Sequence, residues 1–473
     1  MTTTSIADPA ARARPPGLVA ETGVLARLAA PIVVAQLAYM ATGATDSIMA
    51  GRLGTGALAA VGLGAAIWVP VTTFIGGALY VLLPLIAGHA AAGRDGAGGR
   101  DAVQAAWGGI AIGLIGALFL AFGMPQLLPH MGVDPALIDP TAAYLAAVAP
   151  GVPLVGLSMA ARYFCDGHSD TRPAMVTAIF IALLNVPLNL VLMFDDAFGP
   201  GTGAGLGVVG AGISSAICMA TGALILTMRA LTAGRYAPAR RGPVPLRPDL
   251  RAMLGLLRQG LPIGLAFLVE YSMMSTVAVL IGGIGAVALA AHQIAFNVTV
   301  VLFMIPVSVS IGVSIRVGGA IGAADPAAAR RALAAGLALG CGLAMVTAVL
   351  VVLFAPEIAG IYAADDAVVA LAVRLLLLAA AFQVIDALQV VLGGALRGRG
   401  DVNLPLLMML GAYWLVGMPV GWQMGATEGA AGWWYGILAG ITTIAGLFAW
   451  RTWRGFTDRA LRPLMAAGGD MRS

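Results

Sequence analysis

The sequence contains no lysine and few charges of any kind. Of its 473 residues, 60% are hydrophobic and only 10% are charged, and all 26 basic residues are arginine. A water-soluble domain carries roughly 25% charged residues, so this composition cannot cover a surface that faces water. The main solvent of the chain is therefore expected to be lipid. The absence of lysine also excludes the P-loop pattern GxxxxGK[ST], and with it ATP-driven transport by this chain alone.

Cysteine is equally scarce. Cys165, Cys218 and Cys341 lie far apart, without the CxxC or CxxH spacing of a metal site or the density of a disulfide framework. The net charge of +4 comes from thinly spread arginines and does not favour nucleic acid as a partner. We find no GxGD-, HExxH- or HxxxxD-type pattern of a membrane-embedded enzyme. The sequence thus predicts neither an enzyme nor a bound cofactor.

Long apolar runs dominate what is present. Runs of about 20 residues are long enough to cross a bilayer as helices, and helices satisfy their own backbone groups in hydrocarbon. The prediction is an all-α integral membrane protein with twelve transmembrane helices. We expect the spans near 24–48, 57–86, 102–124, 141–162, 174–194, 207–230, 256–281, 287–314, 331–355, 367–392, 404–424 and 430–451.

Charge is distributed unevenly between alternate connections. Arginines occur in both tails, in the linker after span six, and in the loops after spans two, four, eight and ten. The two arginines after span four are Arg162 and Arg172. Acidic residues predominate in the other loops, and Arg52 and Arg374 run against the pattern. Because cytoplasmic loops are enriched in arginine, both termini are predicted to be cytoplasmic.

The chain also matches itself when shifted by 231 positions. Proline, glycine and aspartate at the edges of spans coincide across about 140 residues: Pro31 with Pro262, Gly54 with Gly285, Pro125 with Pro356, Asp134 with Asp365, and Asp170 with Asp401. Each copy holds six spans, so the sequence predicts two six-helix lobes related by a parallel internal repeat. Transporters built this way rock their lobes around a site near the midplane.

The repeat suggests a division of the chain into five parts. These are an N-terminal tail (1–23), an N-lobe (24–230), an inter-lobe linker (231–255), a C-lobe (256–451) and a C-terminal tail (452–473).

Three carboxylates stand inside apolar runs: Asp46, Glu270 and Asp386. A charge at this depth is costly, so it marks a functional site by default, although each group could instead be solvated near an interface. Arg374 lies twelve residues before Asp386, roughly 18 Å along a helix, too far to pair with it. Such carboxylates would bind a proton, a sodium ion or a cationic substrate in competition, which is the chemistry of an antiporter.

Amides form two further pairs with helical spacing. Asn185 and Asn189 flank Pro187, where a broken helix would free carbonyl groups for a cation, and Gln293 and Asn297 share a face of span eight. The alternative role for these amides is interhelical hydrogen bonding.

Several segments together resemble the MATE (multidrug and toxic compound extrusion) family of transporters. They are 31–36, 46–54, 87–94, 185–189, 291–297 and 396–401. The resemblance covers nearly the whole chain. Glu270 and Asp386 match the C-lobe carboxylates of the NorM-type branch.

The resemblance implies export of cationic or amphipathic compounds in exchange for inward Na⁺ or H⁺. It assigns Glu270 and Asp386 to a C-lobe cation site, as Na⁺ ligands if coupling uses sodium. Asp46 would form the N-lobe polar site together with Asn185 and Asn189. The expected cavity residues are Asn185, Asn189, Gln36, Gln293, Asn297 and Phe382. Phe382 stands where NorM-type sequences often have tyrosine, which leaves the coupling ion open.

The expected setting is a bacterial inner (plasma) membrane, with lipid and small-molecule partners and a monomeric chain. The main alternative is a lipid-linked oligosaccharide flippase of the same wider superfamily. Such proteins line their cavity with several basic residues, whereas Arg374 is the only arginine expected here more than five residues inside a span.

Overall fold

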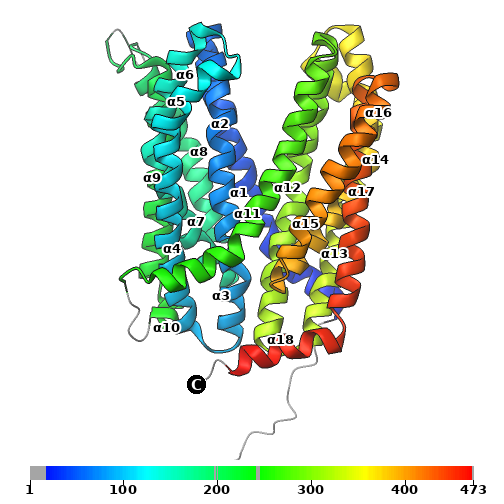
Figure 1. Cartoon of the computed structure of the whole chain (residues 1–473). Helices are drawn as coiled ribbons and strands as arrows, with labels where there is room; N and C mark the ends of the chain where they lie inside the picture. Colours follow the sequence, from blue (N-terminus) through cyan, green and yellow to red (C-terminus); the bar gives the residue numbers. More distant parts are fainter. Residues whose placement is uncertain (1–16, 197–198, 200, 241–245, 471–473) are drawn as a thin grey trace, which may run out of the picture.

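The computed structural model describes residues 17–196, 199, 201–240 and 246–470, and they form a helical bundle of two lobes (Figure 1). Twelve helices in this part of the chain are long and apolar enough to cross a membrane, which confirms the predicted number. Arg12, Arg14 and Arg241, which contributed to the predicted charge pattern, lie outside the described residues.

Six spans make up the N-lobe. Its elements are α1 (Leu18–Leu53), α2 (Thr55–Leu79), α3 (Leu82–Ala91), α4 (Asp95–Leu118), η1 (Phe119–Gly123), α5 (Met124–Leu127), η2 (Leu128–Met131), α6 (Pro135–Val148), η3 (Ala149–Gly151), α7 (Val152–Gly167), α8 (Arg172–Met193) and α9 (Gly207–Thr232). Several spans consist of successive elements, such as α2 with α3 and α6 with α7.

The C-lobe repeats this arrangement after a short linker. The linker contains η4 (Gly234–Tyr236) and α10 (Ala237–Arg240). The C-lobe elements are α11 (Leu250–Gly282), α12 (Ala286–Gly322), α13 (Pro326–Tyr362), α14 (Asp366–Gly398), α15 (Asn403–Gly411), η5 (Ala412–Gly417), α16 (Met418–Glu428) and α17 (Ala430–Gly455), followed by α18 (Asp458–Asp470). Helices α1 and α11 begin inside the stretches expected as tail and linker.

The 231-residue repeat is visible in the backbone. Gly93 and Ala324 both end a helix with positive φ, at 69° and 57°, and Ser169 and Gly400 do so at 57° and 82°. Asp134 and Asp365 each cap a helix by accepting a hydrogen bond from the N–H two residues later, at 2.9 and 2.8 Å. Turns and caps of one lobe therefore recur at the corresponding positions of the other.

The lobes meet at one end of the bundle. We call it the lower end, as in Figure 1; it contains the start of α1, the linker and α18, and the ribbons diverge towards the opposite, upper end. At the lower end α2 packs on α11 and α3 on α12. A Cβ atom placed on Gly77 would lie 2.6 Å from Gly264 Cα, and one on Gly318 would lie 2.5 Å from the Pro84 carbonyl oxygen. Glycine thus lets the two backbones touch.

Two charged contacts span the same interface. Glu21 of α1 is 2% exposed and accepts two hydrogen bonds from Arg316 of α12, from Nε at 2.6 Å and Nη2 at 2.9 Å. Arg397 of α14 lies over the ring of Tyr80 at 5.2 Å. Both contacts join helices of different lobes, although Glu21 falls in the stretch expected as the N-terminal tail.

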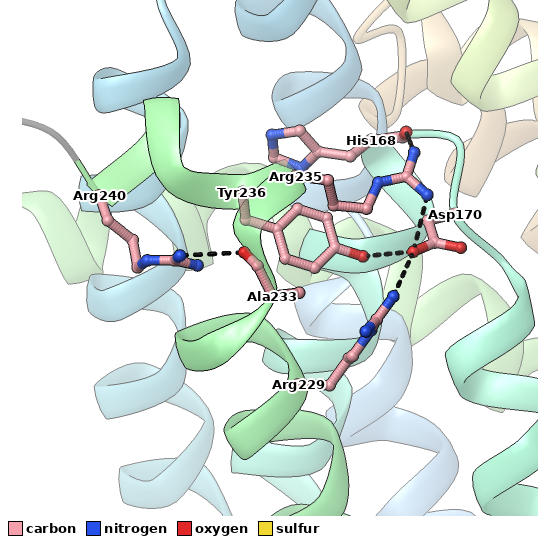
Figure 2. A network of polar contacts seen from close by, with 7 residues as sticks. All are labelled: His168, Asp170, Arg229, Ala233, Arg235, Tyr236 and Arg240. Atoms are coloured by element: carbon pink, nitrogen blue, oxygen red, sulfur yellow. Dashed lines mark hydrogen bonds and ion pairs between the residues drawn. The ribbon is translucent and has the colours of Figure 1, made fainter.

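The linker is fastened to the N-lobe by a polar network around Asp170 (Figure 2). The buried carboxylate accepts a hydrogen bond from Tyr236 Oη at 2.7 Å and pairs with Arg235 at 2.9 Å and Arg229 at 3.7 Å. Burial raises the pKa of the Tyr236 phenol above its usual value, so the phenol stays protonated and donates. In the C-lobe, Asp401 pairs in the same way with Arg451 at 2.7 Å.

We expect Asp170→Ala to destabilise the protein by about 2–3 kcal/mol, because the Tyr236 hydroxyl and the Arg235 guanidinium lose a buried acceptor. A lower melting temperature of the purified chain in detergent would show this. Asp139→Ala, at an exposed position of α6, is the control and should leave the melting temperature nearly unchanged. Equal effects of the two substitutions would contradict the anchoring role of Asp170.

Two local expectations are wrong. Helix α8 runs unbroken from Arg172 to Met193 through Pro187, so no carbonyls are freed by a break there. Arg162 does not lie in a loop: it is 5% exposed within α7, and its Nε lies 3.4 Å from Asp166 Oδ2. The second correction arises because α7 extends to Gly167, beyond the apolar run that marks it, and its end holds a buried polar pair.

Candidate functional site

The N-lobe holds a compact polar cluster around Asp46. The carboxylate lies late in α1 and is 8% exposed. Its Oδ1 accepts hydrogen bonds from Asn185 Nδ2 at 3.0 Å and from Asn189 Nδ2 at 2.6 Å, both on α8. Its Oδ2 accepts a third from Ser215 Oγ of α9 at 3.4 Å. The helical spacing of the two asparagines therefore does place both amides against one carboxylate.

The three donors give the N-lobe cluster a definite polarity. They stabilise a negative charge on Asp46, because each points a positive N–H or O–H end at it. Asn189 Oδ1 is buried without a hydrogen-bond partner among the described residues, so the cluster also offers an unused acceptor. A group with positive charge or donor hydrogens would complete it.

The C-lobe carboxylates are arranged differently. Asp386 of α14 is 7% exposed and accepts a hydrogen bond from Gln389 Nε2, one turn along the same helix, at 3.1 Å. Glu270 of α11 is half-buried and close enough to interact electrostatically with Asp386 and with Arg397. Two acidic groups from different helices thus share one region with fewer donors than surround Asp46.

Tyr413 joins this pair and was missed in the sequence. It lies in η5, a π-helical segment, is fully buried, and interacts electrostatically with both Glu270 and Asp386. Its hydroxyl has no hydrogen-bond partner among the described residues. A tyrosine within an apolar run is no signal by itself. The π-helical turn that rotates it inward is a local feature that hydrophobic periodicity does not reveal.

Ser215 was also missed. It follows Ser214 in a run of small and apolar residues, where serine is ordinary for a packed membrane helix. Only the contact with Asp46, from a helix 169 residues further along the chain, identifies it as part of the cluster.

The other expected cavity residues are dispersed. Gln36 is half-buried and approaches Met304 Sδ of the other lobe at 3.8 Å. Gln293 and Asn297 are exposed on α12. Phe382 is 3% exposed and packs against Trp434, with ring centroids 5.8 Å apart. The structure therefore joins Asp46, Asn185 and Asn189, and associates Glu270 with Asp386, but brings none of these four residues into the two clusters.

Arginine is closer to the carboxylates than expected. Arg374 pairs with Glu428 at the upper end, at 2.6 Å. Arg397 instead interacts with Glu270 while donating to Ser310 Oγ at 3.0 Å. Since Arg397 also lies over Tyr80 of the N-lobe, it links the C-lobe carboxylates to the interface between the lobes.

The described residues contain no group of three or more His, Cys, Asp or Glu side chains able to hold a metal ion. A sodium ion at the C-lobe pair would therefore need further oxygen ligands besides the two carboxylates, and the Tyr413 hydroxyl, which interacts electrostatically with both, is a candidate. A proton needs no such set. The site accommodates either cation in principle, with different demands on Tyr413.

Sequence comparison finds two matches to the MatE family in this chain, over residues 31–191 and again over 262–423. The two matches fall on the two lobes. "Multidrug resistance protein PmpM" of Pseudomonas aeruginosa is 38% identical over 433 residues, which cover 90% of each chain. "Probable multidrug resistance protein NorM" of Shewanella oneidensis is 35% identical, covering 90% of this chain and 93% of that one.

Solved structures agree with the fold. The crystal structure of the eukaryotic MATE transporter AtDTX14 superposes with a TM-score of 0.85 at 18% identity, covering 96% of this chain and all of the other. A multidrug resistance MATE family transporter in an outward-facing conformation superposes with a TM-score of 0.78 at 18% identity, over 95% and 96% of the two chains.

Proposed function

This chain belongs to the MATE family of multidrug transporters, and from that premise we propose that it exports cationic or amphipathic compounds in exchange for inward Na⁺ or H⁺. The observation that carries the proposal is the unequal pair of buried carboxylate sites in the two lobes. Each site would bind a positively charged group. The two sites differ in how many hydrogen bonds the protein already donates to their carboxylates.

The C-lobe pair suits the coupling ion. Glu270 and Asp386 are two like charges in one region, with Gln389 as the hydrogen-bond donor to Asp386. Arg397 is one positive charge beside two carboxylates, so their burial leaves a negative charge that a proton or Na⁺ would neutralise. The field of that cation reaches Arg397, which contacts the N-lobe through Tyr80. Binding at the pair would thereby bias how the lobes pack.

The N-lobe cluster suits a different task. Asp46 already accepts three hydrogen bonds, which offset part of the cost of burying its charge. We assign it to attraction of a cationic substrate or to a second cation, with Asn189 Oδ1 as the free acceptor. The cavity role of Gln36, Gln293, Asn297 and Phe382 remains part of the proposal.

We also propose that the lower end faces the cytoplasm of a bacterium and that the chain spans the inner membrane as a monomer. Arginines of the linker, of the first turns of α13 and of α18 lie at this end, and the turns before α6 and α14, which contain Asp134 and Asp365, lie at the other. This distribution follows the positive-inside rule. The alternative, a lipid-linked oligosaccharide flippase, is less well supported. Such a protein would line its cavity with basic residues, whereas the groups without hydrogen-bond partners at the two sites are mainly acceptors.

Purified protein in vesicles loaded with a cationic dye provides the test. We expect an inward gradient of Na⁺ or of H⁺, imposed separately, to accelerate dye movement in the opposite direction, and the gradient that succeeds identifies the coupling ion. Vesicles without gradient serve as the control. Dye movement equal to that control under both gradients would contradict the proposed function.

A further inference from the structure

A long apolar groove opens on the outer face of the C-lobe near the lower end. It has a volume of about 650 Å³ and lies between α13, α14 and α17, with the start of α18 closing its lower side. Its walls are formed by Leu333, Ala334, Leu337, Leu388, Leu392 and Trp453. The Trp453 side chain is 74% exposed, as expected for an aromatic residue at a membrane–water interface.

One arginine and one aspartate line this groove. Arg330 and Asp458 line it and form an ion pair, with the Arg330 side chain 45% and the Asp458 side chain 55% exposed. The hydrogen bond from Arg330, and the charges of Arg330 and Arg462, hold the pKa of Asp458 below its usual range. Arg330 keeps part of its guanidinium exposed beside this carboxylate, and Arg462 of α18 is close enough to interact with it electrostatically. A guanidinium has five N–H donors, and Arg330 uses one of them on Asp458.

The corresponding position in the N-lobe is covered by the protein itself. Arg330 coincides with Gly99 in the 231-residue repeat, and the backbone of Ala239 in α10 lies directly against Gly99. The linker is held in that place by Asp170, as Figure 2 shows, and by Gln104, which bonds Arg247 O at 3.0 Å and Asp249 N at 2.7 Å. In the C-lobe Arg330 stands at this position and pairs with Asp458 at the start of α18, and the groove beside this pair is open.

We propose that the groove binds one anionic glycerophospholipid from the leaflet at the lower end. An acyl chain would lie along the leucines of α13 and α14, and the phosphate would face Arg330 and Arg462. Several facts select this occupant. The walls are apolar and lie on membrane-spanning helices, so lipid tails are the medium in contact with them. Arginine binds phosphate with paired N–H donors, and basic pockets between membrane helices attract anionic head groups.

Substitutions of Arg330 and of Asp458 should change lipid binding in opposite directions. As an acidic group at the mouth, it competes with the lipid phosphate for Arg330. Arg330→Gln should therefore weaken binding of phosphatidylglycerol, and Asp458→Asn should strengthen it, each by about fivefold, the effect of one charge near a membrane surface. A purely structural ion pair would respond in the same direction to both substitutions.

The experiment titrates the full chain, purified in detergent, with phosphatidylglycerol or phosphatidylcholine and counts bound lipid by native mass spectrometry. We expect tighter binding of phosphatidylglycerol, loss of that preference in Arg330→Gln, and an increase in Asp458→Asn. Arg172→Gln removes an exposed arginine at the lower end of the N-lobe and should change nothing. Ala334→Trp, which fills the groove, should weaken binding of both lipids.

Glycerol 3-phosphate, which lacks acyl chains, distinguishes a lipid site from a simple phosphate site. We expect it to compete poorly with phosphatidylglycerol. Effective competition by glycerol 3-phosphate, equal binding of the two lipids to the unmodified protein, or weaker phosphatidylglycerol binding in Asp458→Asn would each overturn the proposal.

Discussion

Asp386→Asn and Glu270→Gln are each expected to reduce gradient-driven export of a cationic dye about tenfold or more. Each substitution removes a buried negative charge that otherwise needs a cation, so the variant no longer takes up the coupling ion at that position. A loss of about 1.4 kcal/mol in ion binding already corresponds to tenfold. Dye flux from vesicles under an imposed Na⁺ or pH gradient measures the effect.

Binding of the dye separates loss of coupling from loss of structure. We expect dye affinity in Asp386→Asn to remain within about threefold of the unmodified protein, less than 1 kcal/mol, because Asp46 and its three donors in the N-lobe are untouched. Asp366→Asn is the matched control, since it changes an exposed carboxylate on the same helix. Undiminished gradient-driven flux in both site variants would show that these carboxylates do not couple transport.

Tyr413 adds information on the ion. Its hydroxyl has no hydrogen-bond partner among the described residues and interacts electrostatically with both carboxylates, so Tyr413→Phe removes a potential Na⁺ ligand without changing the charge of the site. Sodium coupling would make the apparent Na⁺ affinity fall in this variant, whereas proton coupling would leave transport largely intact. At Phe382 this chain lacks the tyrosine hydroxyl that NorM-type sequences often have. The Tyr413 hydroxyl is therefore the more informative one to remove.

Much of this architecture could be predicted from the sequence. Twelve apolar runs and the 231-residue repeat predicted twelve spans in two lobes, because the length of an apolar helix and the recurrence of its turns are properties of single segments. The pairing of Gly93 with Ala324 and of Asp134 with Asp365 shows that the repeat reaches down to individual turns and caps. The i, i+4 spacing of Asn185 and Asn189 likewise places both amides on one face.

The contacts between segments could not be predicted in the same way. Ser215 and Tyr413 look like ordinary residues of packed helices, and their position depends on how α9 and η5 turn towards carboxylates on other helices. Pro187 fits into a continuous α8, although a proline inside a helix usually costs a hydrogen bond. Arg162 was placed in a loop because a charge normally ends an apolar run, whereas Asp166, one turn later, pairs with it inside the helix.

The second large effect concerns the glycines at the lower end. We expect Gly322→Leu and Gly264→Leu to shift the protein towards a state in which the lobes separate at that end, and to reduce transport about tenfold or more. In this structure a side chain at Gly322 would meet the backbone of Gly88, and one at Gly264 would lie 2.8 Å from the Phe74 carbonyl oxygen. Overpacking costs on the order of 1–3 kcal/mol, and the cost disappears once the lobes part.

Spin labels can report the shift. Labels at Asp139 and Ala426, exposed near the upper end of the two lobes, should come closer together in Gly322→Leu, while labels at Arg100 and Ala323 near the lower end should move apart. Labelling requires replacement of the three free cysteines, of which Cys165 and Cys218 are buried. Gly342→Leu is the matched control, because a Cβ there meets no neighbouring atom within 4 Å.

The same measurement distinguishes a steric block from general damage. A misfolded variant would give broad distance distributions for both label pairs. A shifted equilibrium would keep both distributions narrow, with a shorter distance at the upper end and a longer one at the lower end. Glu21→Gln should produce the same shift to a smaller extent, because it weakens the pair with Arg316 without adding bulk. If Gly322→Leu folds and both distances match those of Gly342→Leu, the glycine contacts do not control which end of the bundle is closed. The close backbone contacts at the lower end would then result from lobe closure without contributing to its free energy.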